Sequence, residues 1–499
     1  MARDLSRRDF LVMTGMTISA AAASDVRAAR AAHDAEGAGP GALLRFPTGF
    51  LWGAATSAYQ IEGAVHADGR GESIWDRFSH TPGKILHGNT GDVACDHYHR
   101  YRHDLDLMQR LGLRSYRFSI AWPRVQPAGT GRVNQKGLDF YRRLVDGLLQ
   151  RGIHPMATLY HWDLPQALQD RGGWPNREMA RWFAAYAEVV FRALGDTVST
   201  WITINEPWVV ANMGYRLGSD APGIRDPQQA TQAIHHLLLG HGLAVQALRA
   251  LHLKGSEIGI TLNLVPIYPV SQRENDRAAA WVQDGFINRT YLDPIFRGAY
   301  PADVMAMDER QGISFHHVEP GDLTVISTPI DVLGVNYYQP WYVTGTADHP
   351  QLVSGHHPRT AMGWEIVPGG LRDLLVRLTR DYGHLPIYVT ENGAAFDDRV
   401  DVHARVDDLA RMRFLHNHVV AAHAALRAGV NLKGYAVWSL LDNFEWIAGY
   451  SKRFGIVYVD YRTQRRIPKR SALWYRDVIR QNGVEKLLKI PAHRSLDDK

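Results

Sequence analysis

The sequence predicts a (β/α)8 barrel, in which eight parallel strands alternate with helices in a single α/β domain. Three observations carry this prediction. From residue 46 onward, short apolar runs alternate with longer amphipathic stretches, which is the pattern of repeated β-then-α units. Eight such runs are present. Almost every run leads into polar or aromatic residues, as barrel strands do at the face that holds the active site.

The eight predicted strands follow one another at intervals that leave room for a helix after each. Apolar residues in these intervals recur every three or four positions, which predicts helices packed on a sheet at 98–111, 137–150 and 177–194. No interval has the composition of an interdomain linker, so one domain is predicted over 42–499. The predicted strands are 49–54, 115–120, 154–159, 200–204, 257–262, 331–335, 386–390 and 432–437.

Composition excludes several other classes of protein. Of the 499 residues, 45% are hydrophobic and 21% charged, as in ordinary soluble domains. The net charge of +5 is spread along the chain without a basic run, so no nucleic-acid partner is expected. Cys95 is the single cysteine and cannot form an internal disulfide. The histidines at 97, 99 and 103 do not share one helix face, so neither a metal nor another cofactor is predicted.

The N-terminus resembles a twin-arginine export signal. Arg7 and Arg8 directly precede an apolar stretch over 11–23 and an alanine-rich region. The apolar stretch is too short for a membrane span, so an exported protein, periplasmic or secreted, is expected to have no integral span after signal removal. Residues 1–41 are accordingly predicted to be signal and linker. An amphipathic first helix is the alternative, and the cleavage site and oligomeric state stay open.

Polar and aromatic residues follow seven of the eight predicted strands. In a (β/α)8 barrel these strand ends open on one face, so their side chains are expected to meet there. In chain order they are Gln60, Arg117, His161, Trp162, Asn205, Glu206, Asn336, Tyr338, Glu391, Asn392, Trp438, Glu445 and Trp446.

Two of these residues are carboxylic acids that directly follow apolar strands. Glu206 precedes Pro207, which cannot continue a strand, and Glu391 lies two residues before Gly393, which is expected to permit a turn. Cleavage of a glycosidic bond needs two carboxyl groups beside the anomeric carbon, one to protonate the leaving oxygen and one to attack or to activate water. The pair therefore points to a glycosidase.

Several motifs in a fixed order extend this interpretation. From about residue 46 to 479 the chain resembles glycoside hydrolase family 1, the β-glucosidase family. The matching segments are FLWGAATSAYQIEG (50–63), YRFSI (116–120), YHWDLP (160–165) and WSLLDNFEW (438–446). The resemblance implies a retaining β-glycosidase that works through a covalent glycosyl-enzyme intermediate.

The resemblance also implies a role for each matching residue. Glu206 corresponds to the general acid/base, Glu391 to the nucleophile, and Arg117 and Tyr338 to groups that keep the nucleophile ionised. Asn205 corresponds to a donor to the sugar 2-hydroxyl, with Asn336 beside it. Sugar ligands are expected at Gln60, His161, Trp162, Trp438, Glu445, Trp446 and Phe454, and a leaving-group contact at Trp364, although His161, Trp162, Trp438 and Trp364 also fit a plain core.

Substrate preference follows from three positions. The resemblance implies O-glycosides, because family members that act on thioglucosides carry Gln where this chain has Glu206. A carboxylate at Glu445 would repel a sugar phosphate, so unphosphorylated β-glucosides are expected, with side activity on β-fucosides and β-galactosides. Asp220 stands where the family often has histidine, which leaves the aglycone preference open. A transglycosylase that uses the same intermediate and a noncatalytic sugar-binding protein are the alternatives.

Overall fold

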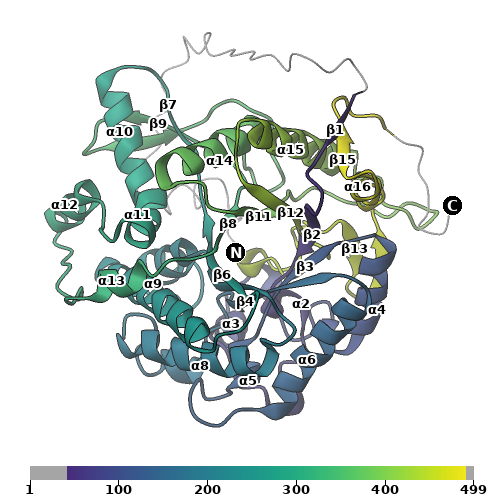
Figure 1. The fold of residues 1–499 in the computed structure, drawn as a ribbon, viewed down its shortest axis with the longest axis horizontal. Helices are drawn as coiled ribbons and strands as arrows, with labels where there is room; N and C mark the ends of the chain where they lie inside the picture. The colour runs from purple at the N-terminus through teal and green to yellow at the C-terminus, as the bar shows by residue number, and fades with distance from the viewer. Residues whose placement is uncertain (1–41, 491–499) are drawn as a thin grey trace.

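The computed structural model describes residues 42–490, which form a closed barrel of eight parallel strands surrounded by helices (Figure 1). The predicted (β/α)8 fold is confirmed. Around the barrel the strands are β11 (Ile387–Asn392), β12 (Leu432–Trp438), β2 (Leu51–Ala55), β3 (Ser115–Ser119), β4 (His154–Tyr160), β5 (Thr200–Asn205), β6 (Glu257–Asn263) and β8 (Val332–Asn336).

All eight predicted strands are confirmed to within two residues at each end. The shift reaches two residues at the end of the seventh strand and at the start of the first, which begins at Leu51 after Gly49, a residue with left-handed backbone and φ of +82°. The three predicted helices are confirmed as α4 (His97–Arg110), α6 (Gln135–Gln150) and α8 (Glu178–Leu194).

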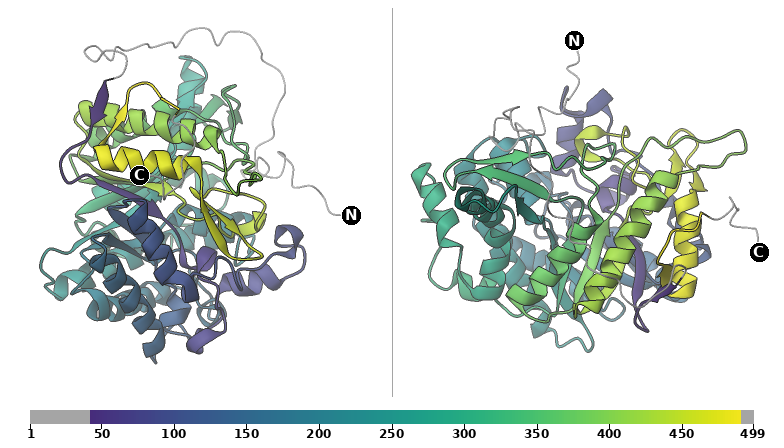
Figure 2. Two further views of the ribbon diagram at one scale, coloured as in Figure 1. Left: turned by 90° about the vertical axis from the view of Figure 1, so that its right-hand side faces the viewer. Right: turned by 90° about the horizontal axis from the view of Figure 1, so that it is seen from above.

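The longer helices form an outer layer around the strands, and α14 (Pro368–Tyr382), α15 (Leu409–Arg427) and α16 (Arg470–Gln481) lie side by side on one flank (Figure 2). Helix α9 (Pro227–Ala250) starts sharply, because the Asp226 side chain accepts hydrogen bonds from two backbone N–H groups of its first turn and Pro227 follows at N1. Helix α11 (Thr290–Arg297) also belongs to the outer layer.

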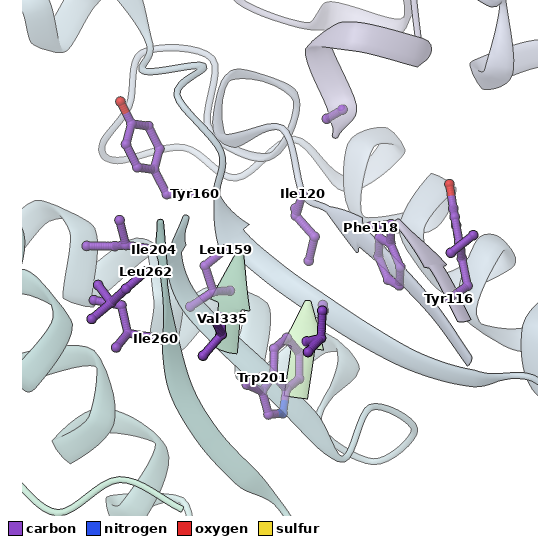
Figure 3. Close-up of a cluster of buried hydrophobic side chains, with 14 of the residues drawn as sticks. Tyr116, Phe118, Ile120, Leu159, Tyr160, Trp201, Ile204, Ile260, Leu262 and Val335 are labelled. Carbon is purple, nitrogen blue, oxygen red and sulfur yellow. The ribbon is translucent and has the colours of Figure 1, made fainter. Parts of the chain in front are cut away.

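Strand alternation separates outward-facing apolar side chains from inward-facing ones, which include a small apolar cluster with Met156 and Ile202 as well as polar side chains. Tyr116 and Phe118 of β3 belong to the buried cluster drawn in Figure 3, together with Trp201 of β5. Arg117 lies between the two aromatic residues and therefore faces the opposite side, the barrel interior. There its Nε donates to Thr158 Oγ1 of β4 at 3.2 Å.

The small sheets outside the barrel were not predicted. The first and last described strands, β1 (Leu43–Arg45) and β15 (Gly483–Glu485), pair antiparallel, while β7 (Ile267–Pro269), β9 (Trp341–Gly345) and β10 (Pro350–Val353) form a second sheet and β13 (Val457–Asp460) and β14 (Arg465–Pro468) a hairpin. Shorter helices fill the connections: α2 (Ala58–Ile61), α3 (Ile74–His80), α5 (Trp122–Val125), α7 (Gln166–Gln169), α10 (Glu274–Asp284), α12 (Ala302–Arg310) and α13 (Asp322–Ile326).

Within residues 42–490, no helix is both long and apolar enough to cross a membrane. The predicted signal and linker, residues 1–41, lie outside the described residues.

Three histidines meet between α9 and the segment that precedes α13. The His317 ring centroid lies 5.5 Å from that of His235 and 6.1 Å from that of His236. His235 Nε2 is hydrogen bonded to Asp322 at 2.8 Å, and Arg177 binds the same carboxylate. Burial lowers the pKa of each of the three rings to about 4. The folded protein therefore holds this cluster neutral at neutral pH.

We expect acid to destabilise the protein through this cluster. Unfolded histidines bind protons below about pH 6.5, whereas the folded rings do so only near 4. The free energy of unfolding should therefore fall as pH is lowered from about 6.5 to 4, by at most roughly 3 kcal/mol for a fully buried ring. Urea unfolding at several pH values would measure the slope.

The variant His317→Phe keeps a ring at this position and removes its proton site. It should show a shallower fall in stability between pH 6.5 and 4 than the unsubstituted protein. His403 is exposed, so His403→Phe is the matched control and should leave the slope unchanged. Equal slopes in all three proteins would contradict the assignment.

Candidate active site

A cavity of about 240 Å³ opens at the carboxyl ends of the barrel strands. The predicted site residues divide into two groups around it. Those that line the cavity are His161, Trp162, Glu206, Asn336, Tyr338, Trp364, Glu391, Trp438, Glu445, Trp446 and Phe454. Gln60, Arg117 and Asn205 are buried directly behind them and hydrogen bonded to lining residues. Asn392, which was also expected at this face, lies outside both groups: it is buried away from the cavity lining, and its Nδ2 donates to the Tyr337 carbonyl at 2.7 Å.

Irregular backbone delivers both carboxylates to the cavity. Between Ile202 and Asn205, β5 advances three residues while β6 advances two, and β11 shifts in the same way against β8 just before Glu391. Such bulges re-aim side chains next to active sites. Glu206 itself has a φ of +49°, in the left-handed region that a residue other than glycine rarely adopts.

The reason predicted for Gly393 is wrong. Its φ is not positive, so no special turn requires glycine. Instead a Cβ at this position would lie 1.7 Å from the Trp438 carbonyl oxygen, too close for any side chain. Glycine is therefore needed for the close approach of the strand ends that carry Glu391 and Trp438.

Donors surround the Glu391 carboxylate on both oxygens. Arg117 Nη1 forms a short ion pair with Oε1, and the Tyr338 hydroxyl donates to Oε2 at 2.7 Å. Arg117 and Glu391 are almost fully buried, so the pair is little screened by solvent. This setting stabilises the ionised carboxylate.

The Glu206 carboxyl has a different setting. Asn336 Nδ2 donates to its Oε1 at 2.6 Å and also to Asn205 Oδ1 at 3.1 Å. The Asn336 orientation is fixed in turn, because Thr390 Oγ1 donates to its Oδ1 at 2.8 Å. No Lys or Arg of the described residues forms an ion pair with Glu206 in the structure.

Burial and neighbouring charges give the carboxyl groups of Glu206 and Glu391 different pKa values. Burial and the neighbouring Glu391 raise the pKa of Glu206 to about 8. Burial also raises the pKa of Glu391, but Arg117 and Tyr338 oppose that effect. Of the two, Glu391 is therefore the stronger acid, and a proton shared by the pair resides on Glu206 at neutral pH.

The Asn205 amide joins the two sides of the site. Its Oδ1 accepts from Arg117 Nη2 at 2.6 Å and from Asn336, which fixes the orientation of the amide. Its Nδ2 must then donate to His161 Nε2, 3.1 Å away. Burial lowers the pKa of His161 well below its ordinary value, so the ring is neutral and carries its proton on Nδ1. That N–H is buried and has no partner among the described residues, while the His161 side chain as a whole lines the cavity.

A second group of polar side chains at the cavity consists of Glu445, which lines it, and Gln60, which lies behind it. Gln60 Nε2 donates to the Phe444 carbonyl at 2.9 Å and lies 3.4 Å from Glu445 Oε2. Burial and the negative charge of Glu391 raise the pKa of Glu445 to about 8. Buried polar groups with unused capacity suit sugar hydroxyls.

Aromatic rings also line the cavity beside these polar groups. Trp438 and His161 lie nearly parallel, with centroids 5.8 Å apart and an interplanar angle of 13°. Trp162 and Trp446 contact at 4.5 Å, and both have left-handed backbone, with φ of +79° and +48°. Flat apolar faces beside hydrogen-bonding groups match the two sides of a sugar ring.

Comparison with known proteins identifies the family. The model of glycosyl hydrolase family 1 matches residues 43–484. The chain belongs to this family. It is 50% identical over 449 residues to β-glucosidase A of Acetivibrio thermocellus, covering 88% of this chain and 99% of that one. It is 52% identical over 447 residues to β-glucosidase A of Thermotoga maritima, covering 89% and 99%.

A solved family structure agrees with the fold. The family 1 β-glucosidase from T. maritima in complex with isofagomine lactam superimposes with a TM-score of 0.86 at 50% identity, and covers 89% of this chain and 100% of that one. A relative from Bifidobacterium breve, a bifunctional β-D-glucosidase/β-D-fucosidase, is 45% identical over 465 residues, covering 88% and 99%.

The cavity of this family member has a further part that was not predicted. Asn263 ends β6, so it supplies the polar residue missing after the fifth predicted strand. The polar residue directly after that apolar run was a signal in the sequence. Asp220, the departure from the family pattern noted in the sequence, also lines the cavity. The other additional lining residues gave no such signal, because most are apolar and lie outside the barrel strands: Trp208, Val209, Met213, Leu264, Val265, Ile287, Gln339, Trp341, Met362, Ile447 and Ala448.

In the part of the chain that the structure describes, no group of three or more His, Cys, Asp or Glu side chains is placed to hold a metal ion. His97 instead forms a buried hydrogen bond to Asp104 at 2.8 Å.

Removing one donor from Glu391 should change both rate and pH dependence. Tyr338→Phe leaves Oε2 without its hydroxyl partner and so raises the pKa of Glu391 further. A hydrogen bond to a charged group contributes about 1.5–3 kcal/mol, so kcat/KM for aryl β-glucosides should fall roughly 10- to 150-fold. The acid limb of the pH profile should move to higher pH.

Tyr337→Phe is the matched control, because the hydroxyl of Tyr337 donates to the Val367 carbonyl and does not touch Glu391. Its acid limb should remain where it is in the unsubstituted enzyme. Identical pH profiles for the 338 and 337 variants would refute the role of Tyr338.

Proposed function

We propose that this protein is a retaining β-glucosidase that releases the nonreducing terminal glucose from unphosphorylated O-linked β-glucosides. The observation that carries the proposal is the pair of strand-end carboxyls, Glu206 and Glu391, which face one cavity and of which Glu206 holds its proton more tightly. One is arranged to give a proton and the other to attack.

The proposed reaction has two steps. Ionised Glu391 attacks the anomeric carbon and forms an ester bond as the bond to the aglycone oxygen breaks, and that oxygen takes the proton from Glu206. In the second step Glu206, now ionised, takes a proton from water, and the hydroxide oxygen displaces Glu391. Two displacements at the same carbon retain the β configuration.

The names of the relatives support the choice of sugar. Two of them are called β-glucosidase A, and the B. breve relative is called a β-D-glucosidase/β-D-fucosidase. We therefore include side activity on β-fucosides and β-galactosides. The cavity lining supports the preference for unphosphorylated sugars, since none of the described residues that line it is a Lys or Arg able to neutralise a phosphate.

The test is the stereochemistry of the first product. Proton NMR during hydrolysis of 4-nitrophenyl β-glucoside should show β-glucose before mutarotation produces the α anomer. Initial release of the α anomer would mean single displacement by water and would exclude Glu391 as nucleophile. Failure to hydrolyse any β-glucoside would instead favour a noncatalytic sugar-binding protein.

We also propose that the protein is exported by the twin-arginine route. The support is the sequence alone, Arg7 and Arg8 in front of an apolar stretch. Replacing both arginines by lysine should leave an active precursor in the cytosol of a bacterial host. Undiminished export of that variant in cell fractionation would argue against the route.

A further inference from the structure

Asp220 is a carboxylate that lines the cavity but has no part in the reaction described above. It lies beyond the π-helical segment Val209–Leu217 that follows Glu206. Its backbone N–H donates to the Met213 carbonyl at 3.3 Å, and Ser219 Oγ donates to its Oδ1 at 3.0 Å. Its other oxygen, Oδ2, accepts no hydrogen bond from any described residue in the structure. The carboxylate is thus held by its backbone with one oxygen unused.

The position of Asp220 places it on the leaving-group side. Glu206 delivers its proton to the leaving oxygen, so the aglycone must extend along the wall that begins at Glu206. Val209 and Met213 line the cavity on the segment between Glu206 and Asp220. The other lining residues that are not assigned to the sugar are largely apolar and offer a second sugar few partners: Trp208, Leu264, Val265, Trp341, Met362, Trp364 and Ile447.

The charges around the cavity are all of one sign. Four carboxyl groups line it, those of Glu206, Asp220, Glu391 and Glu445, whereas no Lys or Arg of the described residues does. Arg117 neutralises Glu391 from behind. Glu206 and Glu445 each have a pKa raised to about 8, mainly by burial, and therefore hold protons at neutral pH.

Among these four carboxyl groups, Asp220 is ionised without a positively charged partner. Burial raises its pKa only to about 6, so it is ionised at neutral pH, and no arginine, lysine or histidine of residues 42–490 forms an ion pair with it. An ionised carboxylate beside aromatic faces is a setting that attracts a cation, both by charge and by cation–π contact.

We propose that Asp220 selects β-glucosides whose leaving group combines an aromatic or alkyl body with a positive charge, such as an ammonium-bearing aryl group. The inference deepens the proposed function and rests on it. The apolar wall binds the body of the aglycone, and Asp220 binds the cationic end. Neutral aryl glucosides lack the second contact, and anionic ones are repelled.

Three substrates of similar shape test the selection: the β-glucosides of 4-(aminomethyl)phenol, 4-(hydroxymethyl)phenol and 4-hydroxybenzoate. At neutral pH and low salt the cationic substrate should have a kcat/KM about tenfold above the neutral one, the effect of one partly screened charge pair. The anionic substrate should lie below both. Raising ionic strength should shrink the cationic preference, because salt screens the attraction. This measurement needs no variant.

Asp220→Asn should bring the ratio of cationic to neutral kcat/KM close to one, whatever happens to the absolute rates. Asp220→Lys should reverse the order in favour of the anionic substrate. Asp226→Asn is the matched control, because it makes the same change in net charge on the same segment outside the cavity, and asparagine still caps α9. Its ratio should equal that of the unsubstituted enzyme.

The possible failures are distinguishable. Hydrolysis of the neutral substrate without any cationic preference, or a preference that survives in Asp220→Asn, would overturn the assignment of Asp220 and leave the proposed function intact. Absence of hydrolysis for all three β-glucosides would overturn the proposed function and this inference together.

Discussion

Replacing Glu391 by alanine should reduce kcat for β-glucosides by at least about 10⁴-fold, the largest effect of any single substitution in this protein. The variant loses both the attacking oxygen and the negative charge that stabilises positive charge at the anomeric carbon. It also leaves Arg117 buried without its partner, so its folding must be checked by thermal unfolding. The measurement is steady-state hydrolysis of 4-nitrophenyl β-glucoside.

Rescue of activity by a small anion distinguishes the loss of the nucleophile from damage to the fold. In Glu391→Ala, azide can occupy the space of the lost carboxylate and attack the same face of the sugar, which yields an α-glucosyl azide while Glu206 still protonates the leaving group. We expect azide to restore turnover of activated substrates. A β-glucosyl azide from this variant would place the nucleophile elsewhere.

Replacing Glu206 by glutamine should produce the second-largest effect, and one that depends on the leaving group. A dinitrophenolate needs no proton, so the first step with 2,4-dinitrophenyl β-glucoside should remain within about tenfold of the unsubstituted enzyme. The second step lacks its base, so steady-state kcat should fall roughly 10²- to 10⁴-fold. Stopped-flow absorbance should show a burst of dinitrophenolate equal to the enzyme concentration.

The same variant tests the pKa of Glu206. The basic limb of the kcat/KM profile should reflect loss of the proton from Glu206, whose pKa is raised to about 8, and this limb should disappear in Glu206→Gln. Asn336 still donates to the glutamine oxygen, so the local structure should persist. Absence of a burst together with an unchanged basic limb would assign the acid/base role to another group.

The barrel could be predicted from sequence because each of its strands is a short apolar run with its own local signal. Glu206 and Glu391 could be predicted because a carboxyl directly after such a run has few structural reasons to be there. The β-bulges that direct these two carboxylates into the cavity could not be predicted, since strand register depends on the neighbouring strand. The apolar residues that line the rest of the cavity, such as Met213 and Trp341, could not be predicted either, because an apolar residue outside the barrel strands looks the same in sequence as an ordinary core residue.

Gly393 illustrates the same limit at one position. Its importance was visible in the sequence, but the physical reason depends on the Trp438 carbonyl, which arrives from a different strand. The left-handed backbone of Trp162, Glu206 and Trp446 gave no sequence signal either, because these residue types ordinarily avoid that conformation.

The pairing of the first barrel strand with the last has a consequence for folding during synthesis. The first barrel strand, β2, pairs with the last, β12, from Leu51 opposite Gly434 to Ala55 opposite Trp438, and β1 pairs with β15 beyond them. Contacts between such distant segments form late, since a long loop must close first. On a ribosome, β2 must wait for β12 to emerge, with one edge unpaired and open to association with other chains. Barrel closure is therefore an event that follows synthesis of nearly the whole domain.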